Sequence, residues 1–183
     1  DVDICKIEDR IVLKQEKIRL GDKKGPRVFE IHVHEKTDLD ITLFKPYYRF
    51  NRQLPTDFTY NQHLLLAKCE NEETMKFSKF WGNSEGQNDC FLCAIVEPGT
   101  YFLYAYVDID SAKDINGNLL DNSLFSSLNV WLNVYSNEFF EFHPKGIDEK
   151  MSVFHRMIKS FNEDNLPQEE NGLLIRADNN FFK

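Results

Sequence analysis

The sequence lacks long apolar runs and clusters of basic residues. Its longest apolar segments, 91–96 and 101–107, fall well short of the roughly 18 residues that a membrane-spanning helix needs. Acidic residues outnumber basic ones by 30 to 22, which gives a net charge of −8. The basic residues are also scattered, so the charge disfavours binding to a phosphate backbone. These absences exclude a helical membrane-spanning protein and argue against nucleic acid as a partner.

Common catalytic signatures are also absent from the sequence. It contains no glycine-rich phosphate loop, no dinucleotide fingerprint, no Gly-x-Ser-x-Gly elbow and no papain-like cysteine start. Hydrolysis by two carboxylates that lie close together in space stays open, but no such pair stands out among the 30 acidic residues. We therefore expect no catalytic residues and no enzymatic activity on this chain.

Glycine and proline are sparse, at 8 and 6 of 183 residues, whereas aromatic residues make up 14% of the chain. Aromatic and β-branched residues favour strands. Apolar and polar residues alternate in 28–34, and the same alternation returns in 39–43 and 127–135. About eight such segments, with short turns and no interleaved helices, predict an all-β fold: an antiparallel β-sandwich.

Several details of this sandwich follow from local patterns. Segments 28–34 and 39–43 are expected to pair or to lie beside each other. Segment 90–96 is apolar on both faces, which is typical of a central strand. The Glu-Pro-Gly turn at 97–99 predicts a hairpin, because proline presets its own φ and glycine supplies a positive φ. Residues 81–89 are polar and contain two glycines, which indicates a loop.

The chain divides into three parts on this interpretation. Residues 1–26 form an N-terminal extension or edge strands, residues 27–143 form the β-sandwich, and residues 144–183 form a C-terminal helix and tail. Between 148 and 161 the apolar residues recur at helical spacing, which predicts an amphipathic helix.

The C-terminal part carries the candidate interaction residues. Phe154 and Ile158 lie on the apolar face of the expected helix, and Phe181 and Phe182 end the tail. Packing on the sandwich and docking on a partner both stay open for this helix. A membrane surface is the less favoured partner, because the polar face carries both signs of charge and few basic residues.

The four cysteines favour structural thiols over a metal or redox site. Cys90 and Cys93 form a Cys-x-x-Cys motif, but residues three apart in a strand point to opposite faces. His32 and His34 share one face, yet no third ligand is apparent. Four cysteines in a chain without a signal-peptide pattern favour a reducing, cytoplasmic compartment.

An acidic stretch between two expected strands is the candidate metal site. Asp108, Asp110 and Asp114 lie in the polar segment 108–126, and calcium takes six to eight oxygen ligands from flexible loops. The EF-hand register fails, since Ala112 occupies the first ligand position. A calcium site and a plain solvated loop therefore both stay open.

Three segments resemble the β-sandwich of calpains, often called domain III. FEIHVHEKTDLDITL (29–43) resembles its opening hairpin, EPGTYFL (97–103) is similar to a turn and strand of that family, and LNVYS (132–136) resembles the closing strand. The resemblance covers roughly residues 27 to 142 and keeps the order of the segments. It implies a sandwich that is not itself catalytic.

The resemblance also implies a role. In calpains this sandwich braces a papain-like protease core, and its acidic loop is associated with calcium-linked and phospholipid-linked regulation. We therefore expect a non-catalytic protein-interaction, scaffold or regulatory module with a protein partner or a neighbouring domain. The alternative is a calcium-dependent phospholipid-binding regulatory domain of a calpain-type cysteine protease.

Overall fold

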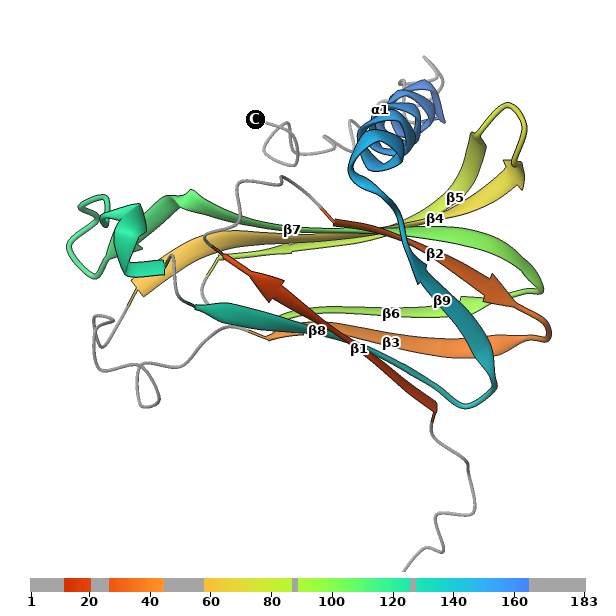
Figure 1. The fold of residues 1–183 in the computed structure, drawn as a ribbon, viewed down its shortest axis with the longest axis horizontal. Helices are drawn as coiled ribbons and strands as arrows, with labels where there is room; N and C mark the ends of the chain where they lie inside the picture. Colours follow the sequence, from red (N-terminus) through yellow and green to blue (C-terminus); the bar gives the residue numbers. More distant parts are fainter. Residues whose placement is uncertain (1–11, 21–26, 45–57, 87–88, 126–127, 165–183) are drawn as a thin grey trace, which may run out of the picture.

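The computed structural model describes residues 12–20, 27–44, 58–86, 89–125 and 128–164 (Figure 1). These residues contain nine strands, a short 3-10 helix and one α-helix. In chain order the elements are β1 (Val12–Arg19), β2 (Arg27–Val33), β3 (Thr37–Phe44), β4 (Phe58–Asn71), β5 (Lys76–Glu85), β6 (Cys90–Val96), β7 (Gly99–Asp114), η2 (Asn122–Phe125), β8 (Asn129–Ser136), β9 (Phe140–Pro144) and α1 (Ile147–Asp164).

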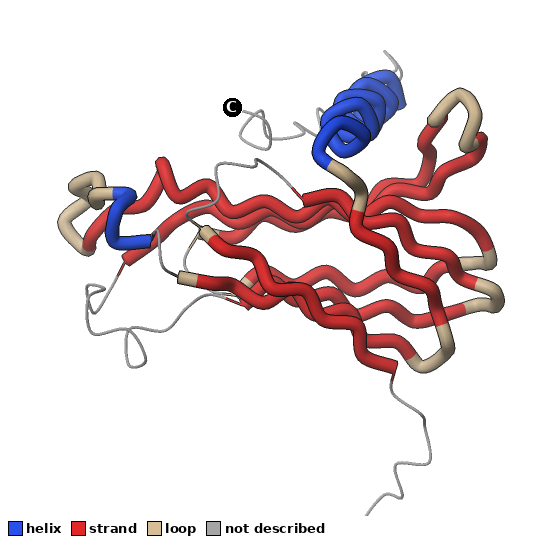
Figure 2. Tube along the Cα trace, in the orientation of Figure 1, coloured by secondary structure: helices blue, strands red, loops and turns tan. Residues whose placement is uncertain are grey.

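The strands form two antiparallel sheets that stack as two layers (Figures 1 and 2). One sheet has four strands in the order β1-β8-β3-β6, and the other has five in the order β5-β4-β7-β2-β9. Helix α1 lies on the outer side of the five-stranded sheet (Figure 1). The fold is therefore the antiparallel β-sandwich with a C-terminal helix that the sequence predicts.

Alternate residues of both sheets meet in the main core. Ile31, Leu64 and Leu103 of the five-stranded sheet are fully buried, as are Leu43 and Leu132 of the four-stranded sheet. Fully burying an aliphatic side chain of this size contributes about 1.5–3 kcal/mol. Because successive side chains of a strand point to opposite faces, the apolar residues of both sheets point into the space between the layers and fill it.

A second core joins helix α1 to the five-stranded sheet. Val153 and Met157 of the helix are buried against outward-facing residues of the sheet, among them Leu65, Phe77 and Phe102. The five-stranded sheet is therefore covered on both faces. This explains why the middle of β4 is a nearly continuous buried run and not an alternating one.

Two expected strand pairings are wrong. Segments 28–34 and 39–43 correspond to β2 and β3, which lie in different sheets. Strands β6 and β7, on either side of the 97–99 turn, also lie in different sheets. Gly99 does adopt a positive φ, of 151°. The turn chemistry therefore fixes where the chain reverses, but the reversal crosses from one layer to the other and makes no hairpin.

Three further local expectations are also wrong. β6 is an edge strand, and its outward residues Phe91, Cys93 and Ile95 are exposed. Residues 81–85 continue β5, because they pair with 62–66 of β4. Asp108 to Asp114 continue β7 and are not part of a connecting loop. In each case pairing with a distant strand overrides the local preference.

Strand β8 and helix α1 match the sequence pattern closely. Strand β8 confirms the alternation seen at 127–135, and α1 confirms the helical spacing at 148–161. Among the described residues, no helix is long and apolar enough to cross a membrane.

Candidate functional site

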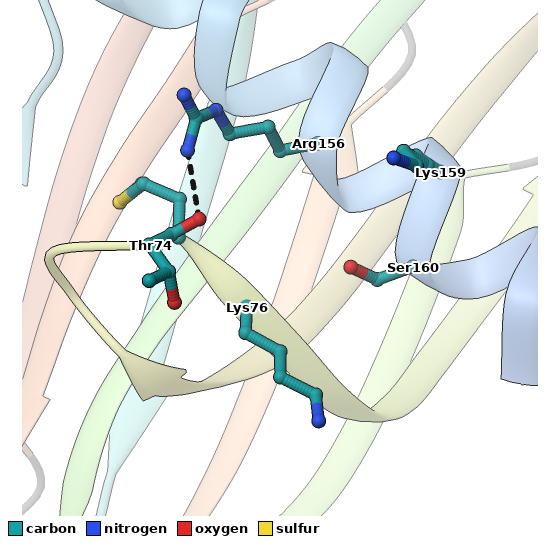
Figure 3. A pocket seen from close by; sticks show the side chains of 6 residues that line it. Thr74, Lys76, Arg156, Lys159 and Ser160 are labelled. Atoms are coloured by element: carbon teal, nitrogen blue, oxygen red, sulfur yellow. Dashed lines mark hydrogen bonds between the residues drawn. The ribbon is translucent and has the colours of Figure 1, made fainter.

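An open cleft of about 440 Å³ lies between α1 and the hairpin of β4 and β5 (Figure 3). The helix contributes one wall and the start of β5 the other. The lining residues are Arg156, Lys159 and Ser160 of the helix and Thr74, Met75 and Lys76 of the hairpin. These six residues include three cations and no carboxylate, in a chain whose net charge is −8.

The hairpin is shaped to meet the helix. Asn71 Oδ1 accepts a hydrogen bond of 2.8 Å from the Thr74 backbone N–H, which closes the turn. Met75 follows with a φ of 51°, a left-handed conformation that is uncommon outside glycine. Arg156 Nη1 then donates a 2.7 Å hydrogen bond to the Thr74 carbonyl and ties the helix to the hairpin (Figure 3).

The predicted interaction residues of the helix contact the chain's own sheet. The Phe154 ring stacks on Tyr104, with ring centroids 4.6 Å apart and planes 14° apart. Ile158 is partly buried against the same apolar cluster. These two residues therefore hold the helix on the sheet. Phe181 and Phe182 lie outside the described residues.

A second cleft of about 370 Å³ lies along the other end of the helix and shares Met75 with the first. Its lining is Glu30, Glu72, Met75, Phe102, Lys145, Glu149, Ser152 and Val153. Three carboxylates and one cation make it acidic on balance. The two clefts on either side of Met75 therefore present opposite charge.

Glu30 is the most constrained of these carboxylates. It pairs with Lys145 Nζ and, through Oε1, with His32 Nε2 at 2.6 Å. Burial acts to raise the pKa of Glu30, but the hydrogen bond and charge of Lys145, with a smaller contribution from His32, outweigh it and lower the pKa. The carboxylate is thus held ionised beside the strand that leads into α1.

The stability of the Glu30→Gln variant should fall less between pH 7 and pH 3 than that of the wild-type protein. A carboxyl whose folded-state pKa is depressed stabilises the fold above its ordinary pKa of 4.5, and this contribution is lost as pH falls through the folded-state value. We expect the variant to lose about 1–2 kcal/mol at pH 7 and much less than that at pH 3. Urea unfolding of both proteins at the two pH values measures this.

Glu97→Gln is the matched control, because the Glu97 side chain is 59% exposed and pairs with Lys36 at the surface. Its stability at pH 7 should change by less than about 0.5 kcal/mol. Equal losses at pH 7 and pH 3 for Glu30→Gln would contradict the assigned role of the ionised carboxylate.

Two of the three predicted calcium ligands accept hydrogen bonds from nearby asparagines. Asp114 accepts hydrogen bonds from Asn118 and Asn116, and these bonds hold its pKa below the ordinary value. Asp110 accepts one from the Asn122 amide, and Asp108 lies on β7. In the described part of the chain, no three His, Cys, Asp or Glu side chains are placed to hold a metal. The structure therefore does not group the three aspartates, and calcium binding stays a prediction.

The cysteines lie as the strand geometry predicts. Cys90 is buried and Cys93 is exposed, on opposite faces of β6. Burial raises the pKa of the Cys90 thiol to about 12, and a hydrogen bond with Asp40 raises that of Cys93. Cys69 is buried as well, and burial raises its pKa. Thiols with raised pKa values are poor nucleophiles at neutral pH.

The histidines pair with nearby polar groups. His34 Nε2 lies 3.1 Å from Glu141, and His143 lies 3.3 Å from the other oxygen of the same carboxylate. His63 Nδ1 lies 2.9 Å from the Ser84 hydroxyl, and burial lowers its pKa. This Ser–His pair spans β4 and β5 and therefore links the two strands.

The sequence interpretation missed the basic cleft. Arg156 and Thr74 are 82 residues apart, so nothing local brings them together. The available signal was the spacing of Arg156, Lys159 and Ser160, which puts all three on one side of the predicted helix, away from its apolar face.

The fold and this cleft define the class of the protein as an antiparallel β-sandwich with a helix-flanked basic cleft. The chain matches no protein-family model and no curated protein.

Proposed function

We propose that this chain is a non-catalytic protein-interaction module of the calpain-like sandwich type, which binds an acidic segment of a partner protein in the cleft between α1 and the β4–β5 hairpin. The observation that carries the proposal is that Lys76, Arg156 and Lys159 all line one cleft. The ordered resemblance of three segments to calpain domain III supports a regulatory or scaffold role. The free thiols support a reducing, cytoplasmic setting.

Arg156 is suited to recognise carboxylates. Its guanidinium has five N–H donors in a planar fork, and one of its nitrogens is anchored to the Thr74 carbonyl. Anchoring restrains the side chain before a ligand arrives, which lowers the entropy lost on binding. The remaining donors can engage a carboxylate with charge-assisted hydrogen bonds.

The shape of the cleft favours a peptide over a small metabolite. Small-molecule sites are usually enclosed and mostly apolar, whereas this cleft is open and Met75 is its only apolar lining residue among those described. The hydroxyls of Thr74 and Ser160 offer further polar contacts. An extended segment with several carboxylates can satisfy the cations together while remaining partly solvated.

A charge reversal in the cleft tests the proposal. A fluorescein-labelled decapeptide of alternating glutamate and serine should bind the wild-type protein at low salt. Arg156→Glu combined with Lys159→Glu should weaken binding at least tenfold, and added salt should weaken the wild-type complex. Fluorescence anisotropy measures both effects.

Lys36→Glu combined with Lys113→Glu is the control, because it changes the net charge equally at exposed positions away from the cleft. Equal weakening by both pairs would contradict the assignment to this cleft. A protein that ignores the peptide but binds phosphatidylserine vesicles only with calcium would favour the calcium-dependent phospholipid-binding function instead.

A further inference from the structure

The basic cleft and the acidic cleft together form one groove along α1, which we call the α1 groove. The two clefts share Met75, and in both the helix lines one side and the β4–β5 hairpin lines the other. Glu149, Ser152, Arg156 and Lys159 line the groove from the helix. They recur every three or four residues, so they lie on one side of the helix. The groove therefore follows this side of α1.

The charge of the α1 groove changes sign on both walls. On the helix wall, Glu149 comes first and Arg156 and Lys159 follow. On the hairpin wall, Glu72 lies in the acidic cleft and Lys76 in the basic cleft. Each end of the groove thus has charges of one sign facing each other. A ligand that spans both ends must carry charges of both signs in a fixed order.

The acidic end has an apolar floor below exposed carboxylates. Phe102 and Val153 are only 2% and 6% exposed and line this end. Glu72 and Glu149 are exposed and come from opposite walls. Lysine and arginine side chains lay an apolar stem along such a surface while the charged head stays near water. The acidic end therefore suits a long basic side chain.

A lysine of the chain itself already binds in this manner at the acidic end. Lys145 pairs with Glu30, and its Nζ lies 5.6 Å from the centroid of the Phe102 ring. This combines a carboxylate with an aromatic face, which attracts cations. Three carboxylates against this one lysine leave an excess of negative charge. Because Lys145 engages Glu30, a second cation would meet Glu72 and Glu149.

The length of the α1 groove sets the spacing of charges on the ligand. Glu149 precedes Arg156 by seven residues and Lys159 by ten. At about 1.5 Å per residue these positions are roughly 10 and 15 Å apart along the helix. An extended chain covers roughly 3.3 Å per residue. The two charges of an extended ligand should therefore be separated by about three to five residues.

We propose that the partner segment carries an arginine or lysine about three to five residues from its carboxylates, and that this cation enters the acidic end of the α1 groove. The inference rests on the proposed function, because the carboxylates of the same segment occupy the basic cleft. Glu72 and Glu149 then also act against other partners, since they repel a segment that is acidic throughout.

Fluorescence anisotropy at low salt with labelled, end-capped heptapeptides tests the inference. The peptides are Arg-Ser-Ser-Ser-Glu-Ser-Glu and the same sequence in reverse order, because the groove does not fix the direction of the chain. Each is compared with a version that has glutamine in place of arginine. In at least one direction, the arginine peptide should bind the wild-type protein at least fivefold more tightly than its glutamine version.

Glu72→Gln combined with Glu149→Gln should reduce this ratio to less than twofold. Glutamine keeps the shape of both side chains and removes the charge. Glu16→Gln combined with Glu35→Gln is the control and should keep the ratio, because it changes the net charge equally at positions outside both clefts. An equal reduction by both pairs would overturn the assignment to the acidic end.

The peptides also separate this inference from the function on which it rests. If the arginine and glutamine peptides bound equally tightly in both directions, the inference would be overturned and the proposed function would stand. If no heptapeptide bound and the alternating glutamate and serine decapeptide also failed to bind, both would be overturned.

Discussion

Replacing Phe125 by alanine is expected to lower the free energy of unfolding by about 3–5 kcal/mol. Phe125 ends η2, at one end of the sandwich, and is fully buried. Its ring lies 5.6 Å from the Phe58 ring and 6.2 Å from the Tyr60 ring, measured between centroids. Removing it forfeits apolar burial and these ring contacts, and it leaves a cavity that two bulky neighbours cannot fill.

The size of this effect is large against the whole stability of a domain, which is about 5–15 kcal/mol. Urea unfolding at pH 7 measures the loss. Phe91→Ala is the control, because Phe91 is 52% exposed on an edge strand. Its expected loss is below about 1 kcal/mol. Equal losses for the two variants would show that Phe125 does not pack as described.

The strands and the helix could be predicted because their periodicity is local. Alternation at 28–34 and 39–43 depends only on one face being buried, and the spacing at 148–161 depends only on one apolar stripe. Both patterns can be recognised within one continuous segment of the sequence. The sandwich class followed from their number and order, and the structure confirms it.

Sheet membership could not be predicted in the same way. The turn at 97–99 has the residues of a hairpin, yet β6 pairs with β3 and β7 pairs with β2 and β4. A reversal between layers and a hairpin within a layer use the same turn chemistry. Which one forms is decided by hydrogen bonds to strands far away in the sequence.

The edge position of β6 was hidden for a related reason. An edge strand is usually marked by charged or polar outward residues, but here Phe91, Cys93 and Ile95 point outward. The segment therefore has the composition of a central strand. These exposed apolar residues are what misled the sequence interpretation.

The basic cleft depends on how α1 docks, and this docking was not readable from the sequence. Arg156 reaches Thr74 only because Met157 and its neighbours are buried against the sheet. An amphipathic pattern shows that a helix has an apolar face, but it does not show which surface receives that face.

Met157→Asp is expected to detach the helix from the sheet and to lower the free energy of unfolding by about 3–5 kcal/mol. Met157 is fully buried in the cluster that includes Val153, Phe77 and Phe102. A carboxylate there would lack water, and nothing in the cluster pairs with it among the described residues. We expect increased binding of a hydrophobic dye to the uncovered sheet and loss of acidic-peptide binding, because one wall of the cleft is removed.

His155→Asp provides the control on the same helix, since His155 is exposed and lies two residues before Met157 in the sequence. It introduces the same carboxylate into water and should change stability by less than about 0.5 kcal/mol. Hydrogen exchange of the α1 amides separates helix detachment from global unfolding, because only the helix should lose protection in Met157→Asp. If that variant retained helix protection and peptide binding, the docking of α1 would not be what shapes the cleft, and the proposed function would lose its structural basis.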